Sequence, residues 1–158
     1  MVLLLRKESM TIEYRKGNLL NVTEGIIMHG CNAQGVMGAG VAKAITDKYP
    51  QCYVNYLHSK DEYRLGKVIW YFHDYGGSLL IANVITQQYC GRDNKRYVNY
   101  TALATGFSKV FDFNEGKKHP VYFPKIGAGL GGGDWNIIEQ LINDADPYDK
   151  VKKVCYEL

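Results

Sequence analysis

The sequence predicts an α/β domain of three layers, in which helices cover both faces of a central mixed sheet. Three observations lead to this prediction: short apolar runs bounded by glycine or proline recur along the chain, segments with a helical repeat separate them, and the turn "DYGG" joins two of the runs. Runs that are apolar throughout are typical of strands covered on both faces. Their alternation with helices is the pattern of an α/β sheet.

The first half of the chain supplies two strands and two helices. Residues 11–16, "TIEYRK", alternate apolar and polar side chains and predict a half-buried strand. Residues 25–30, "GIIMHG", predict a strand that is buried on both faces. The segment 40–49, "GVAKAITDKY", places apolar side chains four positions apart, as one face of a helix requires. The proline at position 50 ends this helix or begins the next one.

The second half begins with a hairpin. Residues 67–73 and 78–86 are rich in β-branched and aromatic side chains, and the turn between them predicts that they pair as antiparallel strands. From Tyr97 onward the repeat changes to three or four residues, which indicates an amphipathic helix. The remaining predicted elements are a buried strand over 121–124, a helix that begins at Trp135 and a closing strand over 151–158.

Length and composition indicate one ordinary globular domain. The chain has 158 residues, of which 46% are hydrophobic and 22% charged, so disorder and fibrous repeats are excluded. The net charge of +3 is spread along the chain without a dense basic block, and we therefore expect no nucleic-acid partner. The domain is expected to span residues 10–158. Residues 1–9 form an N-terminal extension that is an upstream start, a cloning remnant or a short extra strand.

The cysteines and the N-terminus indicate the setting of the protein. The four cysteines are widely separated and show neither a CxxC pair nor metal-ligand spacing with the four histidines. We therefore expect a reduced, cytoplasmic monomer without a metal or a bound cofactor. The apolar run before Arg6 is too short for a signal peptide or a membrane span, so we expect no membrane partner.

Two glycine-rich segments predict the ligand site. "HGCNAQGVMGAGVAKAI", residues 29–45, and "PKIGAGLGGGDW", residues 124–135, each lead from a buried strand into a helix. Glycines there let backbone N–H groups approach an anion at the helix N-terminus. One such segment alone would indicate only a tight turn, but two in equivalent positions favour an elongated phosphate ligand. Neither matches GxxxxGK[ST] or GxGxxG, so a nucleoside triphosphatase is poorly supported.

These segments also carry a family resemblance. "KGNLL", "HGCNAQGVMGAGVAKAI", "YFPKIGAGLGGGDW" and the terminal "VCYEL", in that order and spacing, resemble a macrodomain, the ADP-ribose-binding fold, over nearly all of residues 10–158. The "GAGLGGGDW" form and the histidine ahead of the asparagine are most similar to one branch of that superfamily. This branch contains ADP-ribose 1″-phosphate phosphatases and glutamate-linked ADP-ribosyl hydrolases.

The resemblance implies a set of binding residues. Asn18 matches the position that holds the adenine amino group, although family members commonly have an acidic residue there; a simple turn after Gly17 is the alternative. Asn32 matches the asparagine that faces the distal ribose, with capping of the strand end as its alternative. The segments expected along the diphosphate and the distal ribose are Gly38, Ala39, Gly40 and Val41 in the first loop, and Gly127, Ala128, Gly129, Leu130 and Gly131 in the second.

A phosphatase of this kind would depend on His29, Asn32 and Asp134. His29 can exchange a proton near neutral pH, and Asp134 could act as a base, orient a water molecule or attack phosphorus. The alternatives are that His29 is satisfied by the backbone at a strand end, and that Asp134 caps the helix that begins at Trp135. Capping and catalysis do not exclude each other.

One departure from the family bears on the reaction. The hydrolases of this branch usually have a lysine after the threonine of "NVIT", and this chain has Gln87. Glutamine cannot form a Schiff base, so lysine-dependent removal of ADP-ribose is disfavoured unless Lys95 or Lys125 reaches the site. We therefore expect an ADP-ribose 1″-phosphate phosphatase that yields ADP-ribose and phosphate. The alternatives are a non-catalytic binder of ADP-ribose or a related nucleotide, and an ADP-ribosyl hydrolase.

Overall fold

The computed structural model describes residues 12–91, 93 and 95–157, so the predicted N-terminal extension lies outside the described residues. Six strands form one sheet in the order β1-β6-β5-β2-β4-β3. The pair β3 and β4 is antiparallel and every other neighbouring pair is parallel, so the predicted mixed sheet and hairpin are confirmed. The strands are β1 (Glu13–Lys16), β2 (Gly25–Asn32), β3 (Val68–Phe72), β4 (Leu79–Gln87), β5 (Val121–Phe123) and β6 (Lys153–Glu157).

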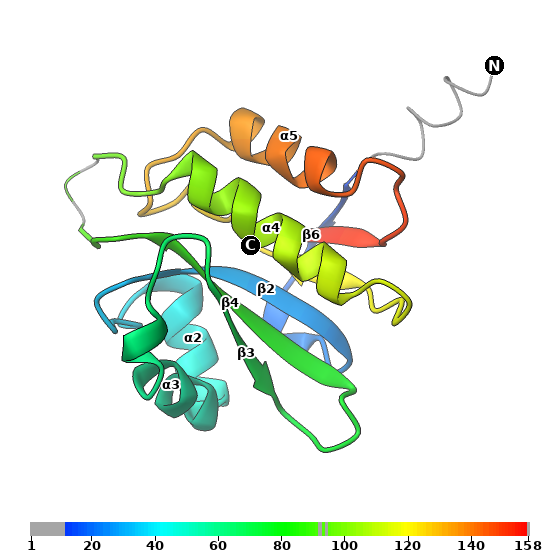
Figure 1. Ribbon diagram of the computed structural model, residues 1–158, viewed down its shortest axis with the longest axis horizontal. Helices are drawn as coiled ribbons and strands as arrows, with labels where there is room; N and C mark the ends of the chain where they lie inside the picture. Colours follow the sequence, from blue (N-terminus) through cyan, green and yellow to red (C-terminus); the bar gives the residue numbers. More distant parts are fainter. Residues whose placement is uncertain (1–11, 92, 94, 158) are drawn as a thin grey trace.

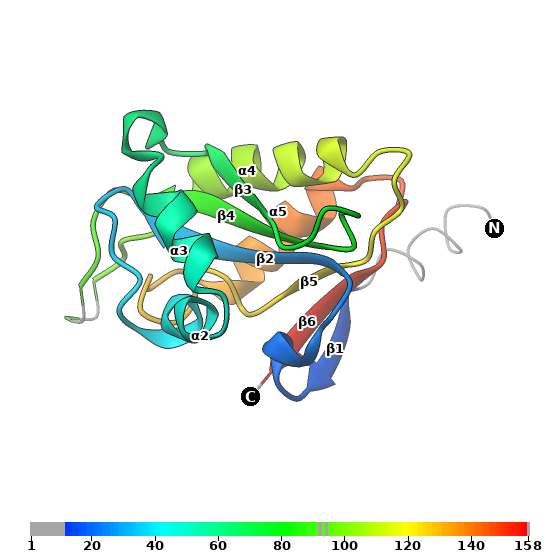
Figure 2. The ribbon, with the colours of Figure 1, turned by 90° about the horizontal axis from the view of Figure 1, so that it is seen from below.

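Helices cover both faces of this sheet, which confirms the three predicted layers. In Figure 1, α4 and α5 lie above the sheet and α2 and α3 lie below it, and Figure 2 shows the same arrangement after a quarter turn. The α-helices are α2 (Gly40–Lys48), α3 (Pro50–Leu57), α4 (Tyr100–Phe113) and α5 (Trp135–Ala145), and short 3₁₀ helices are η1 (Leu19–Asn21) and η2 (Lys60–Glu62). None of the described helices combines the length and apolar character needed to cross a bilayer.

The alternating side chains of β2 divide the core between the two helical layers. Ile26 and Met28 pack with Phe107 of α4 in one cluster, whereas Ile27 packs with Ile45 of α2 in another. Each of these side chains is fully buried, and removing one of the larger ones costs about 2 to 5 kcal/mol of stability. Because side chains alternate along a strand, His29 must lie on the same face as Ile27, toward α2 and α3.

The sheet order brings the two glycine-rich segments together. β2 lies between β4 and β5 and runs parallel to both, with Ile26 opposite Val121 and Leu80. Parallel neighbours end at the same edge of a sheet, and ligands of open α/β sheets bind beyond that edge. The segments that follow β2 and β5 therefore lie side by side, because the two strands pair with each other and helices pack on both faces of the sheet.

Candidate functional site

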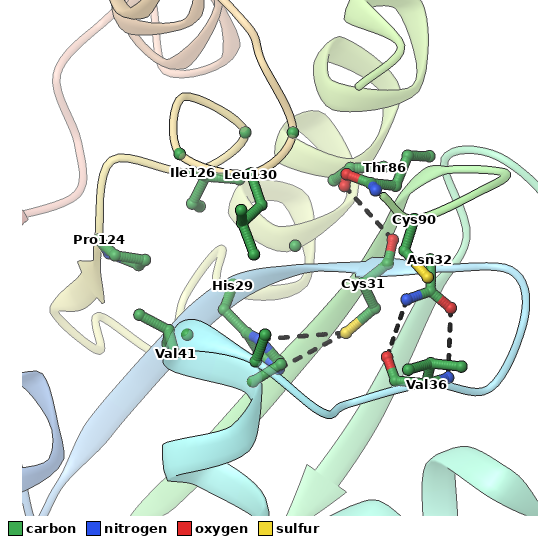
Figure 3. Close-up of a pocket in the computed structure, with 18 of the residues that line it drawn as sticks. His29, Cys31, Asn32, Val36, Val41, Thr86, Cys90, Pro124, Ile126 and Leu130 are labelled. Atoms are coloured by element: carbon green, nitrogen blue, oxygen red, sulfur yellow. Dashed lines mark hydrogen bonds between the residues drawn. The ribbon is translucent and has the colours of Figure 1, made fainter. Parts of the chain in front are cut away.

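A cavity of about 500 Å³ opens at the carboxyl ends of β2, β4 and β5 (Figure 3). Both glycine-rich segments line it, as expected from their positions after neighbouring strands. Its wall also contains Thr86 and Gln87 from the end of β4. The predicted site residues that line this cavity are His29, Asn32, Gly38, Ala39, Gly40, Val41, Gly127, Gly129, Leu130 and Gly131.

A second cavity of about 480 Å³ adjoins the first. Asn18 lines it, together with residues of η1 and the end of β6. The two cavities share a wall that consists of Gly40, Val41, Pro124 and Lys125. They therefore form an elongated cleft with one compartment on each side of the start of α2.

The start of α2 presents free backbone donors to this cleft. Ala39 is its N-cap residue and makes no side-chain capping hydrogen bond, whereas α4 and α5 are capped by the side chains of Asn99 and Asp134. The first N–H groups of a helix have no partner within the helix, and the helix dipole adds a partial positive charge there. Gly40 has φ +58°, a conformation that favours glycine, so the chain can turn directly into the helix at the cavity wall.

The second glycine turn needs its glycines for close packing. Gly127 has φ +76°, and a Cβ atom on Gly131 would lie 2.7 Å from the Gly127 carbonyl oxygen. Gly129, in contrast, would place a Cβ atom in open space, on the cavity side of the turn. Ala128 does not line the cavity, and its N–H group donates inside the turn to the Lys125 carbonyl at 3.1 Å. The turn therefore offers the cleft the backbone of its glycines and of Leu130.

Asn32 holds the loop that leads to α2. Its Nδ2 donates to the Val36 carbonyl at 2.8 Å, and its Oδ1 accepts from the Gln34 N–H at 2.9 Å and from the Tyr56 hydroxyl at 3.2 Å. An amide nitrogen carries two hydrogens, so one remains after the bond to Val36. Tyr56 is fully buried in α3, and its one hydroxyl hydrogen is shared between this Oδ1 and the Asn32 carbonyl. The residues next to Tyr56 in the sequence do not indicate this role, since its partner lies on another element.

The protonation of His29 follows from its contact with Asn83. Asn83 Nδ2 donates to the Ile69 carbonyl at 3.0 Å, so its Oδ1 faces His29 Nε2 at 2.6 Å. Because Oδ1 can only accept, Nε2 must carry the hydrogen, and Nδ1 is the ring atom able to accept a proton. The exposed fraction of His29 is 1%. Burial lowers the pKa of the imidazole to about 4, and the hydrogen bond to Asn83 offsets part of that shift, so the ring is neutral at pH 7.

Cys31 lies beside this histidine in the cavity wall (Figure 3). Its Sγ atom is 3.6 Å from His29 Nε2, and its side chain is buried. Burial raises the pKa of the Cys31 thiol well above its usual value. The thiol is therefore protonated at neutral pH and is not an activated nucleophile.

Two of the predicted site residues, Asp134 and Asn18, use their side chains to cap helices. Asp134 does not line either cavity; its exposed carboxylate caps α5 by accepting from the Asn136 N–H at 2.9 Å. The structure therefore does not bring Asp134 together with His29 and Asn32. Asn18 does line the second cavity, but its Oδ1 caps η1 by accepting from the Leu20 N–H at 2.9 Å.

The position after Thr86 and the segment that follows it complete the wall. Gln87 lines the cavity, and its Nε2 donates to the Tyr89 carbonyl at 2.6 Å. Cys90, which sequence reasoning did not assign, also lines the cavity, and its N–H donates to the Gln34 side chain at 3.0 Å. Of the two lysines considered as substitutes, Lys125 lines the cavity and Lys95 does not. Among residues 12–157 that are described, no group of three or more His, Cys, Asp or Glu side chains could hold a metal ion.

Comparison with known proteins places the chain among proteins of similar sequence and fold. The model of the Macro domain family matches residues 28–142. An uncharacterised 17.5 kDa protein of Enterobacteria phage T4 is 33% identical over 85% of the chain and 89% of its own length. The ADP-ribose 1″-phosphate phosphatase of Candida albicans is 30% identical over 85% of this chain and 94% of its own length. The DNA ADP-ribosyl glycohydrolase of Mycobacterium tuberculosis is 27% identical over 85% of this chain and 38% of its own length. A solved structure of a Bacteroides thetaiotaomicron protein of unknown function superposes with a TM-score of 0.84 at 29% identity, covering 94% of this chain and 99% of that one.

Proposed function

Because the chain belongs to the Macro domain family, we propose that it binds ADP-ribose across the two cavities and releases the terminal phosphate from ADP-ribose 1″-phosphate. The observation that carries this proposal is the uncapped start of α2, which faces the same cavity as the second glycine turn. Backbone N–H groups on two sides of one cleft fit a ligand with linked phosphates. The C. albicans relative supports the choice of reaction by its name.

In this proposal the ligand lies along the cleft. The adenosine occupies the second cavity beside Asn18, the diphosphate crosses the shared wall at Gly40, and the terminal ribose with its phosphate lies in the first cavity near Asn32. The remaining hydrogen of Asn32 Nδ2 would donate to an oxygen of the ribose or the phosphate. Donors that are fixed before the ligand arrives stabilise developing charge without rearrangement.

The proposed reaction is attack of water on phosphorus, with ADP-ribose leaving through its 1″ oxygen. The described residues that line the first cavity include no carboxylate, and His29 is the imidazole among them. A neutral ring whose Nε2–H is held by Asn83 can accept the proton of the attacking water at Nδ1, and it can return that proton to the 1″ oxygen as the bond between phosphorus and this oxygen breaks. The backbone donors would hold the phosphate oxygens while this proton moves. A catalytic role of Asp134 stays a prediction, since its carboxylate caps α5.

A second candidate function is removal of ADP-ribose from a macromolecule, which the name of the M. tuberculosis relative suggests. Gln87 lines the cavity at the position where the family's lysine is expected, and it cannot form a Schiff base. Lys125 is the amine in the wall. This candidate is separated from the first by its product: it releases ADP-ribose from an ADP-ribosylated substrate and no inorganic phosphate.

The test is a phosphate-release assay on ADP-ribose 1″-phosphate, combined with calorimetry on ADP-ribose. His29→Gln keeps a donor for Asn83 but removes the proton acceptor, and we expect a loss of turnover of about 10²-fold or more with binding retained. Asp134→Ser keeps a capping residue for α5 and removes the carboxylate, so a loss of turnover in this variant would show that Asp134 acts in catalysis. Tight ADP-ribose binding without phosphate release by the intact protein would identify a non-catalytic binder instead.

A further inference from the structure

Lys125 carries the one positively charged side chain among the described residues that line the two cavities. It directly precedes the second glycine turn and belongs to the wall that the cavities share. Of the described residues, no other charged one lines the first cavity, and Glu157 is the other charged one in the second. His29 is neutral at pH 7 because burial lowers its pKa. Among the described lining residues, the full positive charge available to an anion in the cleft therefore comes from this lysine.

The position of Lys125 is fixed while its side chain is exposed. Its carbonyl accepts the Ala128 N–H at 3.1 Å, which ties its backbone to the turn. No ion pair within the described part of the chain involves its ammonium group. A lysine stem is long and flexible, so the ammonium can follow a ligand along the shared wall.

The wall that the two cavities share is also where the negative charge of a bound dinucleotide-like ligand would lie. A nucleotide that fills both cavities must cross it with the linker between its two halves, and a diphosphate linker carries two negative charges. The start of α2 contributes only about half a unit of positive charge, and Glu157 in the second cavity opposes further negative charge there. A charge-assisted hydrogen bond from an ammonium group is roughly twice as strong as a neutral one.

We propose that the Lys125 ammonium binds the diphosphate linker where it crosses the shared wall, and that this contact makes the cleft select nucleotides with two linked phosphates over the nucleoside alone. The inference rests on the proposed function, because it assumes an ADP-ribose-type ligand. It assigns to the lysine a role in binding and specificity rather than in covalent chemistry.

The experiment compares calorimetric affinities for ADP-ribose in the intact protein and in Lys125→Met, Lys125→Arg and Lys117→Met. Lys117 is a matched control because its ammonium lies over the Phe113 ring, away from both cavities. We expect Lys125→Met to bind ADP-ribose about tenfold more weakly at low salt, Lys125→Arg to bind within about threefold of the intact protein, and Lys117→Met to be unchanged. The difference should shrink between about 0.05 M and about 0.5 M NaCl, since salt screens the contact.

Adenosine, followed by NMR titration, serves as the ligand without phosphates. Its affinity should be the same in the intact protein and in Lys125→Met. If Lys125→Met binds ADP-ribose within about twofold of the intact protein, or if it weakens adenosine and ADP-ribose equally, the role given to Lys125 is wrong while the proposed function stands. If the intact protein does not bind ADP-ribose, the proposed function itself is wrong, whatever the variants do.

Discussion

His29 makes the stability of the fold depend on pH, because its buried imidazole resists protonation. Its imidazole is buried and neutral, and its folded-state pKa is about 4, compared with 6.5 in a model peptide. Between these two values the unfolded chain binds a proton that the folded protein does not. The stability contributed by the neutral ring is therefore complete above pH 6.5 and is lost as the pH falls toward 4.

The size of this loss follows from the two pKa values. Between pH 7 and pH 5 the shift of the His29 pKa to about 4 corresponds to about 2 kcal/mol of unfolding free energy, and below pH 4 it reaches about 3 kcal/mol. A natural domain has only about 5 to 15 kcal/mol in total. This single ring should therefore account for a substantial part of the acid sensitivity of the protein.

The assay is urea denaturation of the intact protein and of His29→Gln at pH 7 and pH 5. Glutamine can still donate to the Asn83 oxygen but does not titrate, so carboxylates that titrate in both proteins cancel in the comparison. We expect the intact protein to lose about 2 kcal/mol more than the variant between the two pH values. Equal losses in the two proteins would mean that folding does not lower the pKa of His29, and the assignment of a neutral, buried ring at pH 5 would then be wrong.

Further predictions follow from the cleft and from the buried ion pair at the start of β6. Gly129→Val should weaken ADP-ribose binding by about tenfold or more in calorimetry and leave the melting temperature within about 2 °C, because its Cβ meets open space. Gly131→Ala should instead lower the unfolding free energy by about 1 to 3 kcal/mol in urea, because its Cβ would clash with a carbonyl of the same turn. Lys153→Met should cost about 3 to 5 kcal/mol in the same assay, since Lys153 is 1% exposed and pairs with the buried Asp146. Ala39→Asp should raise the unfolding free energy by about 1 kcal/mol and weaken ADP-ribose binding, because its carboxylate would cap the N–H groups that the ligand needs; stronger binding would contradict the anion site.

The fold and the walls of the cleft were accessible from the sequence because they depend on local patterns. The apolar runs, the hairpin turn and the glycine segments each predict their own element, and the rule that parallel strands end at one edge brings the segments after β2 and β5 together. Two glycine-rich segments that are far apart in the sequence thus line one cavity, because their strands are parallel neighbours. The cap of α5 also follows from a local pattern, since Asp134 directly precedes the helix that begins at Trp135.

The chemistry inside the cleft depends on contacts between distant residues, and these could not be predicted. The state of His29 is set by Asn83 on the neighbouring strand, which in turn is oriented by the Ile69 carbonyl on β3. Nothing in the residues next to His29 indicates that its ring is neutral and held at Nε2. The loop geometry of Asn32 likewise depends on a tyrosine of α3.

The uncapped start of α2 connects stability and binding. α4 and α5 show that this chain caps helices with Asn and Asp side chains, and a missing cap costs about 1 kcal/mol. α2 and α3 both begin without a side-chain cap; α3 begins with Pro50, which has no N–H group to satisfy, whereas the first turn of α2 lines both cavities. An anion bound there would supply the missing acceptor, so part of its binding free energy would appear as added stability of the folded protein. A phosphate ligand would thus complete the uncapped start of α2, which is why capping this helix with an acidic side chain should oppose binding while it stabilises the fold.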